Sequence, residues 1–473
     1  MQVKALWWKL VILAGVTLVL MIALLRIGWL VDERQQRQRA AEAGVAAAQA
    51  GPQVLLGPVV QRSCTEEWDG IGGGGKEPLK PVTERRDFIL SALPSELTVD
   101  GTLNQEPRRR GLFKVNAYAG QVGLQARWSN LAALTPPAPR NAGRIQCDAP
   151  RVVVAVSDSR GLRQVTVKRG EAALVVRPGT RNDSYPRGLH AVLPAHALDE
   201  PLALSVAVDL IGMTDFGVVP AAAATQVTLR SDWPHPSFGG RFLPATSTVG
   251  PKGFEATWKV SELATTALRD VAAGRGLPAI DRDPEAGGYP MAPVSDAKNA
   301  QIADTLAFSM IDPVNPYVMS DRAIKYGLMF IVLTFVSVGL LELLSGRRVH
   351  PVQYLLVGLA MTLFFLLLLS LSEHLSFPLS YGLAAASAIG LLAFYGASML
   401  GSARRGLGFG ALVTVLYAAL FVLLNLEKAA LLVGAVLLFA VLAAVMALTR
   451  RIDWYAPGGR TADLPQAELA GTR

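Results

Sequence analysis

The sequence has few charged residues and few cysteines. Only 17% of its 473 residues are charged and 51% are hydrophobic, whereas an average soluble domain carries about 25% charged residues. This shortage excludes a soluble cytosolic enzyme, a histone-like protein and a disordered chain, because long segments must avoid water. Neither of the two cysteines has the spacing of a metal ligand, so a cysteine-bound metal is not expected either.

The net charge of +8 lies mainly at the apolar ends of the chain. Residues 31–323 hold 32 basic and 31 acidic residues, which leaves +1. Residues 1–30 contribute +3 from three basic residues, and residues 324–473 contribute +4 from ten basic and six acidic residues. The basic residues therefore form no patch on a soluble domain, and no nucleic-acid partner is expected.

Six apolar runs are long enough to cross a bilayer as helices, which takes about 17 to 25 residues. They lie at Leu10–Leu25, Ile324–Leu344, Val352–Leu371, Leu379–Leu400, Leu407–Leu424 and Ala429–Leu448. Cytoplasmic loops attract Lys and Arg, and one orientation places every basic pair of the short loops inside. We therefore expect a multi-pass inner membrane protein with both termini in the cytoplasm. The segment 31–323 then lies outside, in the periplasm if the cell is Gram-negative.

The first apolar run could also belong to a cleaved signal peptide, since Lys4 and Lys9 precede it. Residues 48–50 offer a cleavage site, but a charged stretch at 32–39 separates them from the apolar core. An uncleaved membrane anchor over 1–30 is therefore favoured. Residues 31–52 are predicted to form a juxtamembrane helix that is stopped by Gly51-Pro52.

The segment 53–320 is predicted to be a β-rich periplasmic domain. Runs of alternating or β-branched residues recur between turn signals, as at Leu97–Leu103 and Leu202–Leu210, and one helix is predicted at Ser261–Ala273. Short strands at this spacing favour a β-sandwich-like fold, or two stacked sandwiches. A five-helix transmembrane domain at 321–450 and a cytoplasmic tail at 451–473 complete the chain. Residues 289–317 contain several prolines and are expected to return the chain to the membrane.

Cys64 and Cys147 both lie in the exported segment. A disulfide between them would close a loop of about 80 residues, which could stabilise the domain by roughly 4 kcal/mol. The alternative is two unpaired buried thiols. The disulfide is favoured, because a free thiol is a liability in an oxidising compartment.

Two motif matches lack the context that their chemistry needs. Gly70–Lys76 matches the start of a phosphate-binding loop, but Glu77 stands where Ser or Thr must reach magnesium. A flexible hairpin loop is the better interpretation. Ser295–Lys298 matches the S-x-x-K motif of penicillin-interacting enzymes, but the other two motifs of those enzymes do not follow. We therefore expect no enzyme and no catalytic residue, cofactor or metal.

Two polar places remain as candidate functional sites. The first is a rigid aromatic turn with Trp233, Pro234, His235, Pro236 and Phe238, which is either a structural corner or an exposed recognition loop. The second is the pair Glu373 and His374 at the outer end of the third span, where a proton site or simple capping at the interface is possible. Capping is favoured, because no chain of further acids lies deeper.

Glu342 is a third ionisable residue at the edge of a span. It lies in the last turn of the second span and could pair with Arg347 or reach the interface.

Several polar strings together resemble the CreD family of bacterial inner membrane proteins. They are Gly51-Pro52-Gln53, Ser231–Phe238, Asp321–Tyr326, Arg348–Leu359, Leu369–His374 and Thr449–Tyr455, and they cover nearly the whole chain in order. The resemblance implies an inner membrane protein controlled by a two-component system and tied to envelope integrity, colicin tolerance and responses to cell-wall-active antibiotics. It implies no catalytic residue. The two cysteines and the stretch 70–75 depart from the family pattern.

The leading hypothesis is a non-enzymatic envelope protein that acts through its periplasmic domain. Its partners would be the lipid bilayer and, through that domain, envelope proteins or cell-wall components. The alternative is a transporter or channel component that uses the C-terminal helices, with the periplasmic domain as receptor or lid. The oligomeric state does not follow from the sequence.

Overall fold

The chain forms two compact units. The computed structural model describes residues 2–72, 80–140, 143–194, 196–278, 301–312, 315–345, 349–426 and 430–450. A helical unit combines Met1–Arg37 with Val314–Arg473, and a β unit comprises Gln38–Pro313. The first helix, α1 (Gln2–Ala48), contributes residues to both units. The predicted Ser295 motif and the tail at 451–473 lie outside the described residues.

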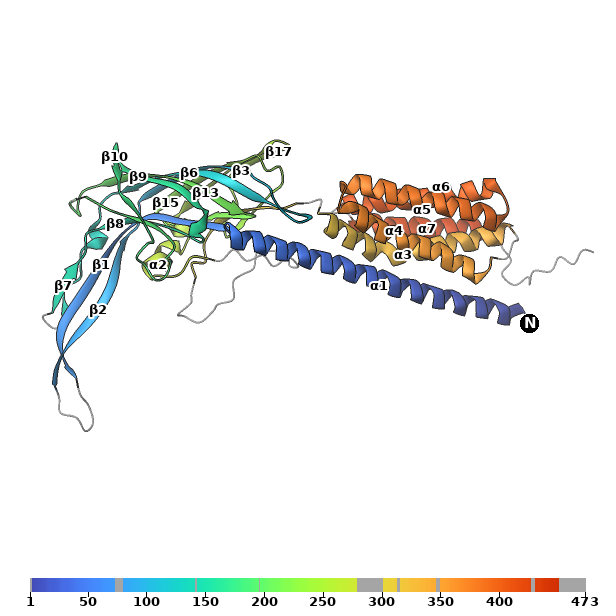
Figure 1. Cartoon of the computed structure of the whole chain (residues 1–473), viewed down its shortest axis with the longest axis horizontal. Coiled ribbons are helices and arrows are strands. Elements are labelled where there is room, and N and C mark those ends of the chain that lie inside the picture. Colours follow the sequence, from blue (N-terminus) through green and yellow to red (C-terminus); the bar gives the residue numbers. More distant parts are fainter. Residues whose placement is uncertain are drawn as a thin grey trace, which may run out of the picture. The chain divides into compact units, whose positions relative to one another are not determined.

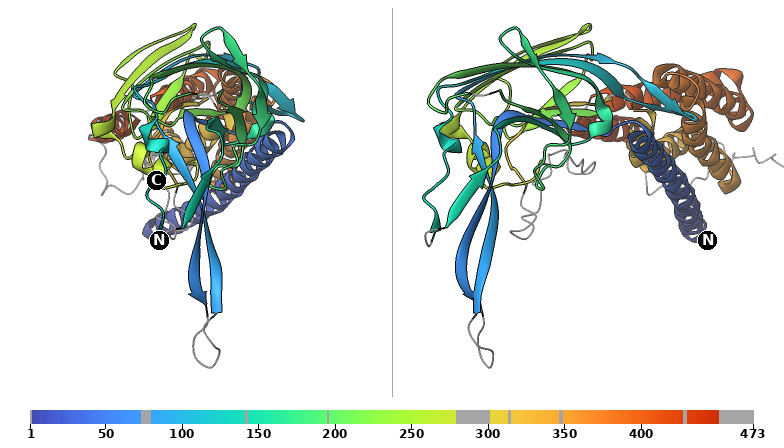
Figure 2. Two further views of the ribbon diagram at one scale, coloured as in Figure 1. Left: turned by 90° about the vertical axis from the view of Figure 1, so that its left-hand side faces the viewer. Right: turned by 60° about the vertical axis from the view of Figure 1, so that its left-hand side comes forward.

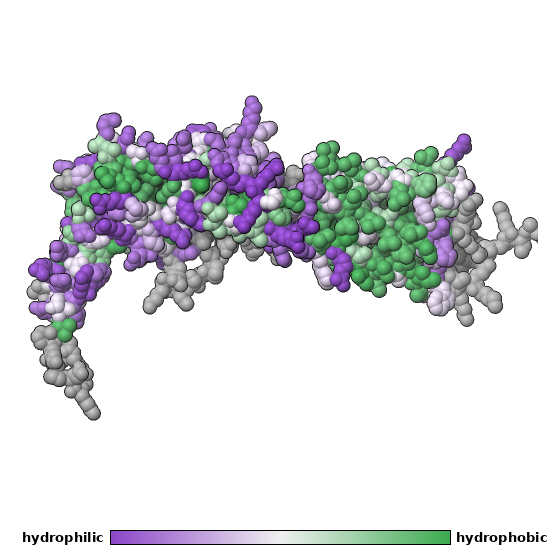
Figure 3. Space-filling model, viewed as in Figure 1, coloured by the Kyte–Doolittle hydropathy of each residue, from purple (hydrophilic) through white to green (hydrophobic). Residues whose placement is uncertain are grey.

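Apolar helices build the helical unit (Figure 1). After α1 they are α3 (Pro316–Ser345), α4 (Pro351–Ser372), α5 (Phe377–Leu400), α6 (Ala403–Asn425) and α7 (Ala430–Thr449). Among the residues that the structure describes, five helices are long and apolar enough to cross a membrane, and α7 contains a shorter apolar stretch at Leu432–Ala447. Apolar residues dominate the visible surface of α3–α7 in Figure 3. The predicted helical membrane fold is thereby confirmed, with five helices of spanning length where the sequence predicted six.

Local signals set the ends of the short helices. At the start of α4, the His350 ring accepts a hydrogen bond from the Val352 N–H, and the Gln353 side chain accepts one from the His350 N–H. This capping box satisfies two backbone donors, and Pro351 occupies the first turn, where its missing N–H costs nothing. Gly401 ends α5 in a left-handed conformation, with φ of 63°.

Two large sheets build the β unit. The nine-stranded sheet contains β1 (Gln53–Gly72), β2 (Lys80–Ala92), β7 (Arg144–Cys147), β8 (Arg151–Val156), β11 (Val176–Pro178), β12 (Gly188–Val192), β14 (Asp215–Val218), β16 (Pro236–Gly240) and β19 (Leu306–Met310). The eight-stranded sheet contains β3 (Glu96–Gln105), β6 (Ala117–Trp128), β9 (Leu162–Arg169), β10 (Ala172–Leu174), β13 (Leu202–Met213), β15 (Ala224–Ser231), β17 (Thr246–Gly250) and β18 (Gly253–Ser261). A separate hairpin joins β4 (Arg108–Arg110) to β5 (Phe113–Val115). The predicted β-sandwich-like domain is confirmed.

The order of the strands brings the two ends of the β unit together. In the nine-stranded sheet the order is β11-β12-β8-β1-β14-β19-β16. The first strand, β1, pairs with β14 in parallel, and β14 pairs on its other side with the last strand, β19. Strands β1 and β2 also form a long hairpin that extends beyond the body of the unit (Figure 2). The Gly-rich segment predicted as its loop lies partly at 73–79, outside the described residues.

One apolar core fills the space between the sheets. Side chains of β3 alternate between exposed and buried, so that Leu97, Val99 and Leu103 face this core. Trp128 and Trp258 are its largest fully buried side chains. Each indole N–H donates to a backbone carbonyl, that of Ala92 and that of Phe242, respectively. The buried tryptophans therefore leave no polar atom unpaired.

One sequence expectation for the end of the β unit was wrong. Instead of a helix at Ser261–Ala273, Ser261 ends β18 and the α-helix α2 covers only Ala267–Ala272. A carboxylate distant in sequence explains the short helix, because Asp304 accepts hydrogen bonds from the Thr265 hydroxyl and the Thr266 N–H at 2.8 and 2.7 Å. The Pro-punctuated return segment also contains the strand β19, and all five of its residues are buried.

Candidate functional site

Tryptophans mark two levels along α1. Trp7 and Trp8 are 66% and 69% exposed, and Trp29 is 62% exposed. At a rise of 1.5 Å per residue, the two groups lie about 32 Å apart, which matches the thickness of the hydrocarbon core. Exposed tryptophans at this spacing are typical of the two interfaces of a bilayer. They delimit the part of α1 that spans it.

Between these levels, α1 packs closely on the other helices of its unit. Leu20 and Leu24 are buried in the apolar core of the helical unit. A Cβ atom at Gly358 of α4 would lie 2.1 Å from Leu20 Cδ1, and one at Gly327 of α3 would lie 3.2 Å from Leu24 Cδ1. The two glycines therefore provide the space that each leucine fills, as small residues do where membrane helices approach closely.

A polar cluster, here called the inner cluster, joins α1 to α3 and α4. The Lys9 ammonium donates to Glu342 Oε1, and the Tyr354 hydroxyl donates to Glu342 Oε2 at 3.0 Å. Lys9 Nζ also lies 5.6 Å from the centroid of the Tyr354 ring. Glu342 therefore has a partner on α1. Arg347, its expected partner, lies outside the described residues.

A second polar cluster, here called the outer cluster, includes one of the predicted residues. Glu373 caps the end of α4, and its side chain is 12% exposed. Arg34 Nη1 of α1 lies 3.4 Å from Glu373 Oε1, and the Tyr317 hydroxyl at the start of α3 donates to the same carboxylate. His374 is exposed. The arrangement favours the capping interpretation of Glu373 over a proton site shared with His374.

The two clusters lie one bilayer thickness apart on α1. Lys9 and Arg34 are 25 residues apart, which is about 38 Å along a helix. Each cation offsets a carboxylate that would be costly to expose to lipid alone. The ion pairs at the two borders join α1 to α3 and α4.

Sequence reasoning placed both carboxylates at borders but did not find their basic partners. Lys9 and Glu342 are 333 residues apart, and Arg34 and Glu373 are 339 residues apart. The available signal was the order of the spans along the chain, because it decides which helix ends lie at the same membrane border. In a six-span topology, the start of α1 and the end of α3 share one border, and the end of the α1 span and the end of α4 share the other.

The predicted aromatic turn is largely built into the fold of the β unit. Trp233 is buried, and its indole N–H donates to the His235 carbonyl at 2.7 Å. Phe238 lies in β16 and packs edge-to-face on Phe254 and Trp258, with ring centroids 5.5 and 5.7 Å away. His235 alone of the aromatic side chains in this turn is exposed. These contacts favour the structural-corner interpretation.

A disulfide joins Cys64 and Cys147. The two residues lie directly opposite each other in the antiparallel pair of β1 and β7, which extends over only four residue pairs. Next to the disulfide, the buried Glu66 accepts a hydrogen bond from the Arg140 N–H at 2.7 Å. The disulfide thus links the short strand β7 to the long hairpin of β1 and β2, and the hydrogen bond from Arg140 attaches the loop before β7 to the same hairpin.

A buried guanidinium, which sequence reasoning missed, lies close by in the same sheet. Arg151 is 3% exposed and donates to Ser63 Oγ at 2.7 Å and to the Arg181 carbonyl at 3.3 Å. Burial lowers the pKa of Arg151, and the nearby Arg181 charge lowers it further. No sequence signal marks this residue, because it opens an otherwise apolar strand. Among the residues that the structure describes, no group of three His, Cys, Asp or Glu side chains could hold a metal ion.

Comparisons with known proteins agree over almost the full length. A family model described as inner membrane protein CreD matches residues 5–455. The chain is 33% identical to the inner membrane protein CreD of Escherichia coli K12 over 455 residues, which cover 95% of this chain and 94% of the relative.

Similarity to solved structures is weak. A mutant M1 zinc metallopeptidase from Deinococcus radiodurans with a bound substrate matches 35% of this chain and 38% of its own, at 12% identity and a TM-score of 0.21. The unmutated enzyme matches the same shares at 11% identity and a TM-score of 0.17. These values carry no argument about fold or activity.

Proposed function

The chain belongs to the CreD family of inner membrane proteins, and from that membership we propose a non-enzymatic role for it in the bacterial envelope. Its β unit, exposed to the periplasm, contributes to envelope integrity and to the response to envelope stress, colicins and cell-wall-active antibiotics. It does so by binding envelope proteins or cell-wall components.

The observation that carries this proposal is the construction of the β unit. Two large sheets enclose one apolar core, and a disulfide ties β7 to the hairpin of β1 and β2. The unit lies in sequence between the helices α1 and α3. A large disulfide-linked domain that is connected to apolar helices at both ends offers an extended surface for binding partners.

Two further observations support the periplasmic position of the β unit and the cytoplasmic position of both termini. A disulfide is stable in an oxidising compartment, which the periplasm is. Lys9, Arg404, Arg405 and Arg450 lie at the ends of helices that this topology places inside. The inner and outer clusters are consistent with the same topology, because each cluster joins helix ends that this topology assigns to one membrane border.

Deletion of the gene tests the envelope role. We expect the deletion strain to differ from the parent in envelope permeability, in its response to cell-wall-active antibiotics and in colicin sensitivity. Expression of the full-length chain should restore the parental value of all three properties. A deletion strain that matches the parent in all three assays would overturn the proposal.

The transporter alternative receives less support. Both border carboxylates are paired with cations from α1, so neither is an open site for a coupled ion. Replacing Glu373 by Gln and His374 by Ala separates the two functions. A transporter that uses these residues would lose the phenotype although the protein accumulates, whereas the proposed role predicts that the phenotype remains.

A further inference from the structure

A short basic hairpin, formed by β4 and β5, is separate from the two large sheets of the β unit. In the described part of the chain these strands pair only with each other. Residues 106–115, which contain the basic hairpin, hold four basic residues and one acidic residue and so have a net charge of +3. The whole segment 31–323 has a net charge of only +1. The basic hairpin therefore concentrates positive charge on a unit that is otherwise nearly neutral.

Two cations of the basic hairpin face each other. Arg109 and Lys114 are directly opposite in the antiparallel register, and both are exposed. Like charges in directly opposite positions destabilise a strand pair. Glu106 is paired with Arg108 at 2.7 Å, and within the described residues no acidic side chain pairs with Arg109, Arg110 or Lys114. An external anion would neutralise these three cations and relieve the repulsion between the two that face each other.

The basic hairpin is docked on the last turns of α1. At its base, Arg108 lines a small hollow together with Ala50. Closer to its turn, the guanidinium of Arg110 lies against Gly44 and leaves no room for a Cβ atom there. A small apolar cluster between these two positions anchors β5 to the helix. From base to turn, the neighbouring positions on α1 run from Ala50 back to Gly44, so the basic hairpin points toward the residues of α1 that enter the membrane.

The turn of the basic hairpin carries an exposed apolar side chain. Leu112 is 61% exposed, and Gly111 before it has a φ of 61°, the left-handed conformation that favours glycine. An apolar side chain flanked by cations is typical of segments that lie in the interface of a bilayer, where the apolar group enters the headgroup layer and the cations contact anionic lipids. A soluble anion would neutralise the cations but would leave Leu112 in water.

We propose that the basic hairpin binds the anionic lipid headgroups of the membrane that α1 spans. Gly44 is ten residues from Arg34 of the outer cluster, or about 15 Å along the helix, and the basic hairpin points toward that border. Its three cations bind the lipid phosphates, and Leu112 enters the headgroup layer. This contact attaches the β unit to the bilayer at a third point, besides α1 and α3. The inference goes beyond the proposed function, because it assigns to this unit a lipid surface and not an envelope partner.

A fluorescent probe on the turn tests the proposal in the full-length protein. The variant Leu112→Cys supplies a free thiol, whereas Cys64 and Cys147 are joined in a disulfide, so a nitrobenzoxadiazole maleimide labels the turn alone. The labelled protein is reconstituted into nanodiscs of phosphatidylcholine, either alone or with about 30% phosphatidylglycerol, that contain a small fraction of lipid spin-labelled at the headgroup. Leu263→Cys is the matched control, because Leu263 is 94% exposed and follows the far end of β18 from the basic hairpin.

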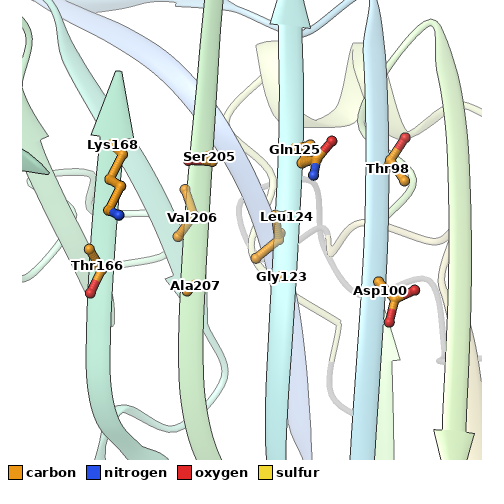
Figure 4. A pocket seen from close by; sticks show the side chains of 10 residues that line it. All are labelled: Thr98, Asp100, Gly123, Leu124, Gln125, Thr166, Lys168, Ser205, Val206 and Ala207. Atoms are coloured by element: carbon orange, nitrogen blue, oxygen red, sulfur yellow. The ribbon is translucent and has the colours of Figure 1, made fainter. Parts of the chain in front are cut away.

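The two facing cations provide a test of charge. The double substitution Arg109→Gln, Lys114→Gln removes a repulsion and two exposed charges, so it should keep the melting temperature of the parent. The matched control is Lys168→Gln, Lys259→Gln, which removes the same charge from exposed positions of the eight-stranded sheet. Figure 4 shows Lys168 on its strand β9 in this sheet. Both double variants are combined with the labelled Leu112→Cys.

We expect the spin label to quench the probe at position 112 at least twofold in nanodiscs with phosphatidylglycerol, and much less in phosphatidylcholine alone or in about 0.5 M NaCl. The probe at position 263 should show little quenching in either lipid. The variant Arg109→Gln, Lys114→Gln should quench only as the parent does in phosphatidylcholine, and the lysine control should match the parent.

Equal quenching at positions 112 and 263 would overturn the inference. Equal quenching at position 112 in the two lipid mixtures would also overturn it, and this is the result expected if the basic hairpin binds an acidic protein instead. A deletion strain without an envelope phenotype would overturn the proposed function but not these results on the reconstituted protein.

Discussion

Removing the disulfide should strongly destabilise the β unit. Cys64 and Cys147 are 83 residues apart in sequence, and in the chain-entropy model a loop of this length contributes about 4.5 kcal/mol through the unfolded state. A domain is typically stable by about 5 to 15 kcal/mol. Strand β7 pairs with β1 through only four residue pairs, so few other contacts would hold it. The double variant Cys64→Ala, Cys147→Ala should therefore lose a large part of the domain's stability.

The expected shift can be given as a temperature. The β unit spans Gln38–Pro313, and its unfolding entropy should be about 0.6 kcal/mol/K from the average per-residue value. A loss of about 4.5 kcal/mol then corresponds to a melting temperature lower by about 8 °C. Thermal unfolding of the full-length protein in detergent, followed by tryptophan fluorescence, measures this shift.

Two further measurements make the reasoning refutable. A reductant should bring the parent to the melting temperature of the double variant and leave the variant unchanged. A maleimide reagent should label neither cysteine of the denatured, unreduced parent. Labelling of both thiols, or a shift of less than 2 °C in the double variant, would refute the argument.

Three other substitutions test the packing of the two units. Asp304→Asn should cost about 1 to 3 kcal/mol of unfolding free energy at pH 7. Burial alone would raise the pKa of Asp304, but the hydrogen bonds that it accepts lower it, so its contribution is full above pH about 3.9 and is lost as the pH falls further. Urea unfolding should show a smaller difference from the parent at pH 3 than at pH 7, and a constant difference would contradict this. Arg34→Glu should lower the melting temperature of the helical unit, and the added Glu373→Arg should partly restore it; no restoration would argue against their pairing. Gly358→Ala should cost about 1 to 3 kcal/mol, because the new Cβ overlaps Leu20 Cδ1, and the added Leu20→Ala should relieve the overlap. If Gly358→Ala and Leu20→Ala together lowered the melting temperature by the sum of their separate effects, the contact between Gly358 and Leu20 would be contradicted.

The sequence predicted those elements whose signal is local. Apolar length suffices to find the spans, and alternation suffices for strands such as β3 and β13, where every second side chain is buried. The strands β14 and β19 gave no alternation, because all of their residues are buried. The helix predicted at Ser261–Ala273 was shortened by Asp304, whose position in space no local pattern reveals.

The candidate sites also differ in how much of them a local sequence pattern reveals. Glu373 was found because a carboxylate at the edge of an apolar run is visible in the sequence, but its partner Arg34 is 339 residues away. The buried guanidinium of Arg151 could not be predicted, since the residue opens an otherwise apolar strand and its partners Ser63 and Arg181 lie far away in the sequence.

Because β14 lies between β1 and β19 in the sheet, the order of synthesis determines when these strands can pair. The hairpin of β1 and β2 can pair as soon as it emerges, but the stretch from Gln53 to Leu55 must wait for β14, and β14 must wait for β19. From Gln53 to Leu306 the ribosome adds 253 residues, which takes about 13 to 50 seconds at ordinary rates of synthesis. During this time the strand edges that later pair with β14 and β19 stay open. A nascent chain cut before Leu306 lacks the strand that joins β14 to β16, so the β unit can complete its sheet only when synthesis has almost reached α3.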